Sequence, residues 1–181
     1  MRVVKLGGSL LETGKMFDCL KHILNSDVQT IAVCGGGEFS NLVRNFQEKW
    51  QFDDVAAHEM AILAMQQTAI MCQNLQHEFV IVASILKIKQ HYFSIWSPDI
   101  KELNAGNIKS SWEITSDSLA AWLAIQLNAD ELVIVKSCDI DSALTVTELS
   151  ERCIVDSEFS SFIAEATFDL NVISTKGFLN L

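Results

Sequence analysis

The chain lacks the features that mark several common classes of protein. Only one of its 181 residues is proline, so no proline-rich linker divides it. No apolar run approaches the ~20 residues that a membrane-spanning helix needs. Lys and Arg total 13 against 23 Asp and Glu, which gives a net charge of −10, whereas binding to a phosphate backbone relies on clustered Lys and Arg. We therefore expect one domain over residues 1–181, located in the cytoplasm, with no membrane and no nucleic acid as its partner.

The cysteines and histidines lack the spacing of a metal or redox site. No CxxC pair occurs among the five cysteines, which are Cys19, Cys34, Cys72, Cys138 and Cys153. The four histidines are equally dispersed, and His58-Glu59 is not followed by the second histidine that a helical zinc motif places at position 62. We therefore expect no metal site built from protein ligands.

Two common nucleotide-binding motifs are also missing. A P-loop needs four residues between its glycines and a Ser or Thr after the lysine, but Gly8 and Gly14 are separated by five residues and Met16 follows Lys15. The GxGxxG fingerprint of dinucleotide-binding proteins is absent as well. A nicotinamide-dependent enzyme is therefore unsupported.

What the chain does have is a regular alternation of strands and helices. Strand-like apolar segments occur at 2–6, 28–34, 92–96, 131–136 and 170–174, and helical periodicity occurs at 15–25, 38–50, 54–76, 116–128 and 157–166. The segment Phe79 to Ile88 fits both a strand and a helix, and the choice stays open. The alternation predicts an α/β protein, a three-layer α/β/α sandwich with a mainly parallel central sheet.

Two glycine turns follow predicted strands. Lys5-Leu6-Gly7-Gly8-Ser9 ends the first strand, and Gly35-Gly36-Gly37 follows the second and precedes a helix. Exposed backbone N–H groups in such turns form a concavity for an anion, and a nearby lysine adds a compact positive charge. Two phosphate-sized cradles suggest a donor and an acceptor. The alternative interpretation of each turn, a tight connection with close helix–strand packing, remains open.

Two later segments carry charged residues at element ends. Thr115-Ser116-Asp117 opens the helix at 116–128, where any of the three could cap the helix. Lys136-Ser137-Cys138-Asp139 ends a strand that is apolar on both faces. A lysine at this position could contact phosphate or simply solvate the strand end.

Taken in order, these segments resemble the amino acid kinase family, which includes aspartate, acetylglutamate and uridylate kinases. The match spans roughly residues 2 to 140. The resemblance implies phosphoryl transfer from ATP, with Mg²⁺ bound through the nucleotide, to a small acceptor. It implies catalytic roles for Lys5 and Asp117 and acceptor contacts at Gly35, Gly36 and Gly37. The nucleotide contacts that it implies are Gly7, Gly8, Ser9, Lys136, Ser137 and Asp139.

A narrower resemblance is to the short kinases of methanofuran biosynthesis and one-carbon metabolism, which phosphorylate an aminomethylfuran methyl phosphate. It rests on His58-x-Met60-Ala61, Trp96-x-Pro98 and Ser111-Trp112-x-x-Thr115. It implies acceptor contacts at His58, Glu59, Trp112 and Thr115, while a solvated helix face stays open as the alternative for His58 and Glu59. Trp96 and Trp112 could also stack on a flat ring, or be core residues. Uridylate kinases carry Asp-His-Met where this chain has His58-Glu59-Met60, which disfavours a uridylate acceptor.

The chain departs from larger family members after the nucleotide loop. Those members carry a Gly-Gly-Met-x-x-Lys segment that supplies a second lysine, but this chain has no glycine between Asp139 and Lys176. Lys109, Lys136 or Lys176 could supply the charge. Two other functions stay open: a kinase of the same family acting on an amino acid carboxylate or a nucleoside monophosphate, and a non-catalytic nucleotide- or anion-binding subunit. The Met-rich helix 54–76 predicts a homo-oligomer, a dimer or larger.

Overall fold

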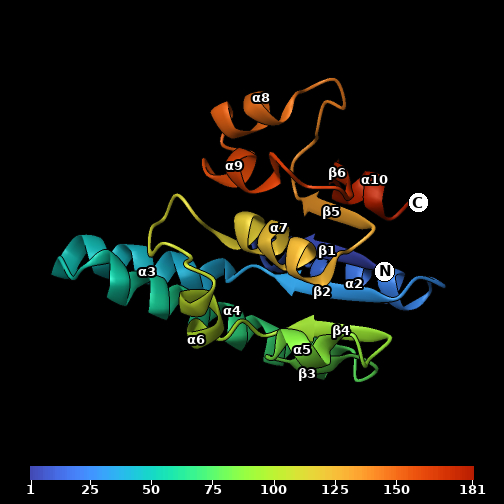
Figure 1. Cartoon of the computed structure of the whole chain (residues 1–181), viewed down its shortest axis with the longest axis horizontal. Helices are drawn as coiled ribbons and strands as arrows, with labels where there is room; N and C mark the ends of the chain where they lie inside the picture. Colours follow the sequence, from blue (N-terminus) through green and yellow to red (C-terminus); the bar gives the residue numbers. More distant parts are fainter.

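Six parallel strands form one sheet with helices on both faces (Figure 1). The computed structural model describes all residues from 1 to 181. The strands are β1 (Arg2–Leu6), β2 (Thr30–Cys34), β3 (Val80–Val82), β4 (Phe93–Trp96), β5 (Glu131–Lys136) and β6 (Asp169–Ser174). Their order is β3-β4-β2-β1-β5-β6, and every neighbouring pair is parallel. The predicted α/β sandwich is confirmed, with a sheet that is wholly rather than mainly parallel.

The five helices predicted from periodicity are present, and the structure adds short helices of four to six residues that were not predicted. The helices are α1 (Ser9–Glu12), α2 (Met16–Leu24), α3 (Gly37–Trp50), α4 (Asp54–Leu75), α5 (Ile85–Ile88), α6 (Ile100–Ala105), α7 (Ser116–Leu127), α8 (Val146–Glu151), α9 (Phe159–Ile163) and α10 (Thr175–Phe178). The ambiguous segment 79–88 contains both elements, first β3 and then α5. The helix predicted at 157–166 is shorter, because the chain must turn after α9 to pair Asp169 with Glu131. None of the helices combines the length and the apolar character that crossing a membrane requires.

Alternation along β1 assigns its side chains to two separate cores. Val3 belongs to the larger core, which is formed with the apolar residues of α7, while Val4 and Leu6 belong to the second core, formed with α2. Successive side chains of a strand point to opposite faces, so Lys5 lies on the same face as Val3, under α7. The sheet thus directs a lysine toward the start of a buried helix.

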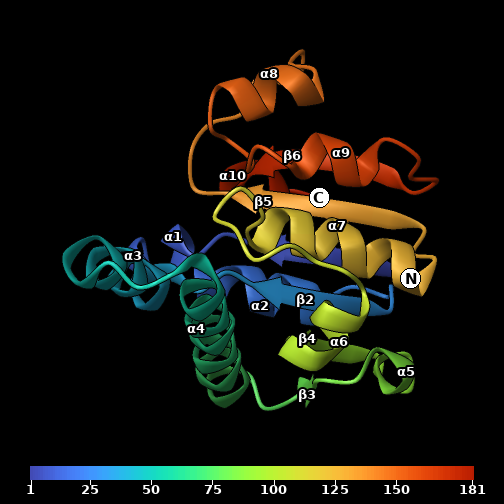
Figure 2. The same ribbon diagram turned by 60° about the vertical axis from the view of Figure 1, so that its left-hand side comes forward.

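The carboxyl ends of β1, β2 and β5 lie together at one end of the sheet. Helices α3 and α4 pack as a pair and project beyond this end (Figures 1 and 2). In Figure 2, α7 runs along the sheet face, with α8 and α9 above it. Both glycine turns connect strands to helices here, as expected for a ligand site in a parallel sheet.

Candidate active site

Asp117 connects two lysines at the ends of β1 and β5. Nζ of Lys5 lies 2.6 Å from Oδ1 of Asp117, and Nζ of Lys136 donates to Oδ2 at 2.7 Å. Strand register explains the arrangement, because Lys5 lies opposite Ile134 and Lys136 follows two residues later on the same face. The side chains of Lys5 and Asp117 are each 5% exposed, and that of Lys136 is 15% exposed. Two cations on one carboxylate leave a positive charge for an anionic ligand.

The surroundings shift the pKa values of this centre. Burial raises the pKa of Asp117, but the charges of Lys5 and Lys136 and their hydrogen bonds outweigh burial, so the pKa lies below its usual value. Burial and then repulsion from Lys5 lower the pKa of Lys136 to about 8, although Asp117 and Asp156 act in the opposite direction. Asp117 is therefore a fixed carboxylate, while Lys136 titrates just above neutral pH.

The two glycine turns pack directly against each other. A Cβ atom on Gly8 would lie 2.4 Å from the backbone nitrogen of Gly37, and one on Gly35 would lie 2.9 Å from that of Gly8. Gly37 also has a φ of +54°, in the left-handed region that favours glycine. Close packing therefore explains the glycines at Gly8, Gly35 and Gly37.

The same turns leave backbone donors unused. The N–H groups of Gly8, Ser9, Gly36 and Gly37 have no hydrogen-bond acceptor in the chain. The N–H of Gly7, in contrast, donates to the carbonyl of Val135 at 3.1 Å. Gly7 therefore offers no N–H to a ligand, which corrects the sequence prediction for this residue. The four free donors, two of them at the start of the 14-residue α3, are therefore available to an anionic ligand.

A cavity of about 270 Å³ opens beside these donors. Its walls come from both glycine turns, from α3 and α4, and from the segment that leads into α7. Its apolar side chains are Ala61, Ile62, Met65, Trp112, Ile114 and Leu119, and its polar side chains include Glu12, Ser40, Asn41, Arg44, Asp54 and His58. Sequence reasoning missed Asn41 and Arg44, although their spacing from Gly37 places all three on one helix face.

His58 and Glu59 differ in their relation to this cavity. His58 lines it and is 6% exposed, and its buried Nε2 has no hydrogen-bond partner in the protein. Burial lowers its pKa, with an opposing effect of Glu59, so the imidazole is neutral at pH 7. Glu59 is exposed and does not line the cavity, which differs from the sequence prediction.

Trp112 and Trp96 also differ in their position relative to the cavity. Trp112 lines the cavity, and the Arg44 guanidinium carbon lies 3.8 Å from its ring centroid, while its Nε1 donates to Oε1 of Gln47 at 2.6 Å. One face of the Trp112 ring is thus covered by Arg44. Trp96 is 1% exposed and packs against Trp122 in the core, so it is a core residue and not a stacking platform.

The loop after β5 contacts the first glycine turn. The hydroxyls of Ser9 and Ser137 lie 2.8 Å apart and form a hydrogen bond. Asp139 is exposed further along the same loop. Thr115 lines the cavity, but its N–H and hydroxyl both donate to Asp156, at 2.9 and 2.8 Å. Sequence reasoning missed Asp156, because no local pattern pairs it with a helix 40 residues away.

The structure separates the three lysines that could replace the family's second lysine. Lys109 is 75% exposed and pairs with Glu113 at 3.5 Å, and Lys176 is exposed on α10. Lys136 contacts Asp117 directly. Among the three, Lys136 is therefore the one beside Lys5.

Comparison with known proteins agrees with this geometry. The model of the amino acid kinase family matches residues 1–141. The chain is 28% identical over 152 residues to the (5-(aminomethyl)furan-3-yl)methyl phosphate kinase of Methanocaldococcus jannaschii, covering 77% of this chain and 67% of that protein.

Solved structures show the same fold. The uridylate kinase of Archaeoglobus fulgidus superposes with a TM-score of 0.73 at 17% identity, over 99% of this chain and 94% of that one. The UMP kinase of Bacillus anthracis superposes with a TM-score of 0.71 at 17% identity, over 97% of this chain and 87% of that one. The match of the family model over most of the sequence confirms the resemblance seen in the motifs. The chain therefore belongs to the amino acid kinase family and is an ATP-dependent kinase.

Proposed function

We propose that this kinase transfers the γ-phosphoryl group of MgATP to the phosphate of an aminomethylfuran methyl phosphate. An acceptor phosphate oxygen forms the new bond to the γ-phosphorus, and the bond from that phosphorus to the bridging oxygen of ADP breaks. The products are ADP and the diphosphate ester. The M. jannaschii relative supports the proposal, because its name describes a kinase that acts on this phosphate.

The observation that carries the proposal is that Asp117 is paired with two lysines, which disfavours a role as a base. Both of its oxygens contact lysines, and it is the only acidic residue that forms an ion pair with Lys5 or Lys136. An alcohol acceptor needs a group that removes its proton. A phosphate monoester is already ionised at neutral pH and needs none. The centre therefore suits an oxyanion acceptor.

In this proposal, the two lysines neutralise the group in transfer. Phosphoryl transfer depends largely on positioning and on charge stabilisation. Lys5 and Lys136 contact the transferring phosphoryl from β1 and β5, and the N–H groups of Gly8 and Ser9 bind the donor phosphates. Lys136 thus takes the role that larger relatives assign to a later lysine. Ser137 and Asp139 line the nucleotide side.

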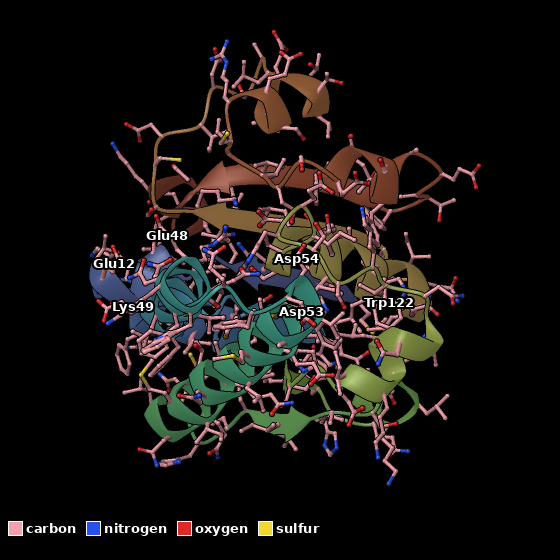
Figure 3. The ribbon with its side chains drawn as sticks, turned by 90° about the vertical axis from the view of Figure 1, so that its left-hand side faces the viewer. Glu12, Glu48, Lys49, Asp53, Asp54 and Trp122 are labelled. Atoms are coloured by element: carbon pink, nitrogen blue, oxygen red, sulfur yellow. The ribbon has the colours of Figure 1, made fainter.

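The cavity supplies complementary groups for each part of the acceptor. The free N–H groups of Gly36 and Gly37, together with the exposed guanidinium of Arg44, attract its phosphate. The apolar side chains of α4 cover the furan ring. Asp54, which begins α4 beside Asp53 (Figure 3), supplies a carboxylate for the aminomethyl ammonium group.

Magnesium fits this site as an ion carried by the nucleotide. No group of three or more His, Cys, Asp or Glu side chains is arranged to hold a metal ion. Mg²⁺ binds readily through substrate phosphates while keeping several waters. When bound with ATP, it neutralises charge on the β- and γ-phosphates.

The test is ADP release with a panel of acceptors: the aminomethylfuran phosphate, UMP, aspartate and acetylglutamate. We expect the highest kcat/KM with the aminomethylfuran phosphate. Faster turnover of UMP would instead assign a nucleoside monophosphate acceptor, and aspartate or acetylglutamate turnover would assign a carboxylate. ADP release with none of the four would contradict the proposed acceptor.

We also propose that the kinase assembles as a homodimer through α3 and α4. Three large apolar side chains on one face of α3 are exposed: Phe39 by 40%, Leu42 by 50% and Phe46 by 41%. Leu63 and Ile70 on α4 are exposed by 53% and 62%. Exposed apolar side chains that share a helix face fit a protein interface. Sedimentation should give twice the monomer mass, and a monomer at micromolar concentration would refute the dimer.

A further inference from the structure

Helix α7 is capped by a residue distant in the sequence. Its N-cap residue, Thr115, makes no capping bond with its own side chain. Oδ2 of Asp156 instead accepts from the N–H and hydroxyl of Thr115, at 2.9 and 2.8 Å, and from the N–H of Ser118 at 3.0 Å. The hydroxyl of Ser118 donates to Oδ1 of Asp156. Four hydrogen bonds therefore converge on one carboxylate.

The cap holds the first turn of the helix that carries Asp117. Thr115 and Ser118 flank Asp117, so Asp156 fixes the backbone on both sides of it. A carboxylate also interacts favourably with the positive end of the helix dipole. The side chain of Asp156 does not line the cavity. Its influence on a bound phosphate is therefore indirect and passes through the first turn of α7, which carries Asp117.

Asp156 is itself held in place by buried neighbours. Val155 and Phe159 are 2% and 0% exposed and belong to the larger core. The carbonyl of Asp156 accepts from the N–H of Phe159 at 3.2 Å, and α9 packs against α7. Figure 2 shows α9 beside α7 on the same face of the sheet. The half-buried capping carboxylate is therefore anchored by neighbouring core residues.

We propose that Asp156 is a positioning residue for phosphoryl transfer, which orients Asp117 and thereby sets the spacing of Lys5 and Lys136. This residue lies beyond the part of the chain that the family model matches, which ends at residue 141. The segment without a Gly-Gly-Met-x-x-Lys motif thus contributes a carboxylate that orders the two-lysine centre. The inference rests on the kinase activity but not on the identity of the acceptor.

The charge of Asp156 also acts on Lys136. The charged groups facing Lys136 are Lys5 from β1, Asp117 from α7 and Asp156 from the segment before α9. Lys5 lowers the pKa of Lys136, after burial, and the two carboxylates raise it. Removing the charge of Asp156 therefore shifts the titration of Lys136 to lower pH, an effect that a purely structural cap would not produce.

The experiment compares Asp156→Asn with Asp99→Asn. Asp99 also caps a helix, α6, by accepting from the N–H groups of Lys101 and Glu102, but it does not line the cavity. For Asp156→Asn, we expect kcat to fall at least tenfold with less than a threefold change in the KM for ATP. The ¹³Cε NMR titration of Lys136 should move to lower pH by at least 0.5 units. Asp99→Asn should leave both unchanged.

The NMR titration needs no acceptor, so a failure of the acceptor proposal leaves this test intact. If Asp156→Asn keeps kcat within twofold and leaves the Lys136 titration unmoved, the inference is overturned. An equal loss of kcat in Asp99→Asn would likewise reduce Asp156 to an ordinary cap. Should Asp156→Asn fail to fold, Ser118→Ala removes one donor and keeps the charge. We then expect a threefold or greater fall in kcat, and wild-type kcat would overturn the inference.

Discussion

The two-lysine centre and the neighbouring cavity, which is the proposed acceptor site, differ in how far their polar groups are satisfied. In the centre, Lys5 and Asp117 are 5% exposed and joined at 2.6 Å. In the cavity, the N–H groups of Gly36 and Gly37 and Nε2 of His58 have no partner in the chain. Asp54 is exposed, and its Oδ1 accepts from Nε2 of Gln47 at 2.9 Å. A preorganised charged centre stabilises a transition state, whereas polar groups without a partner in the protein are available to bind a ligand. Changes to the centre should therefore lower kcat, and changes to the cavity should raise the KM of the acceptor.

Replacement of Lys5 by methionine should have the largest effect. The change removes a cation from the transferring phosphoryl, and we expect kcat to fall ~10³-fold, as for other groups that stabilise transition-state charge. Asp117 keeps Lys136 as a partner, so the protein should still fold. ADP release at saturating substrates measures the loss. Lys15→Met, which removes an exposed lysine paired with Asp18, is the matched control. Unchanged kcat in Lys5→Met would end the assignment.

Lys136→Met should lower kcat by ~10²-fold, since this lysine supplies the second positive charge at the same carboxylate. Lys176→Met serves as the control, because Lys176 is exposed on α10. The same kinetic assay, with a thermal melt to verify folding, separates the two. A greater loss of kcat in Lys176→Met than in Lys136→Met would show that Lys176 on α10, and not Lys136, supplies the second positive charge.

The pH dependence of kcat/KM for ATP should reveal Lys136 directly. Burial and the neighbouring Lys5 lower the pKa of Lys136 to about 8, and only the protonated form attracts phosphate. The rate constant should be level below about pH 7, fall to half of its plateau value near pH 8 and reach about a tenth of it at pH 9. In Lys136→Arg this decline should disappear, because arginine remains charged. A flat profile through pH 9.5 in the wild type would contradict the assignment.

Asp54→Asn should have the smallest effect and alter only acceptor binding. Loss of an exposed charge weakens its pairing with an ammonium by ~1 kcal/mol, a fivefold rise in KM. The acceptor analogue without the aminomethyl group should bind both proteins equally. Asp53→Asn is the control, since Asp53 caps α4 through the N–H of Ala56 and does not line the cavity. If the acceptor and its analogue without the aminomethyl group have equal KM values in Asp54→Asn and also in Asp53→Asn, Asp54 does not contact the amine.

The sequence predicted the parts of the site that depend on local pattern. Strand periodicity and glycine turns located Lys5, and the position of Lys136 at a strand end followed from the same reasoning. It could not predict which backbone donors are free, because Gly7 bonds to Val135, a neighbour only in the folded sheet. The capping role of Asp156 could not be predicted for the same reason, since its partners belong to a helix that begins 40 residues earlier.

A crystal structure of the complex with MgADP, aluminium fluoride and the acceptor phosphate tests the central claim most directly. The fluoride mimics the phosphoryl group in transfer. We predict that Nζ of Lys5 and Nζ of Lys136 both lie within hydrogen-bond distance of the fluoride, with Asp117 still joining them and the acceptor phosphate at Gly36 and Gly37. Lys136 turned away from the fluoride, with Lys109 or Lys176 in its place, would contradict the account.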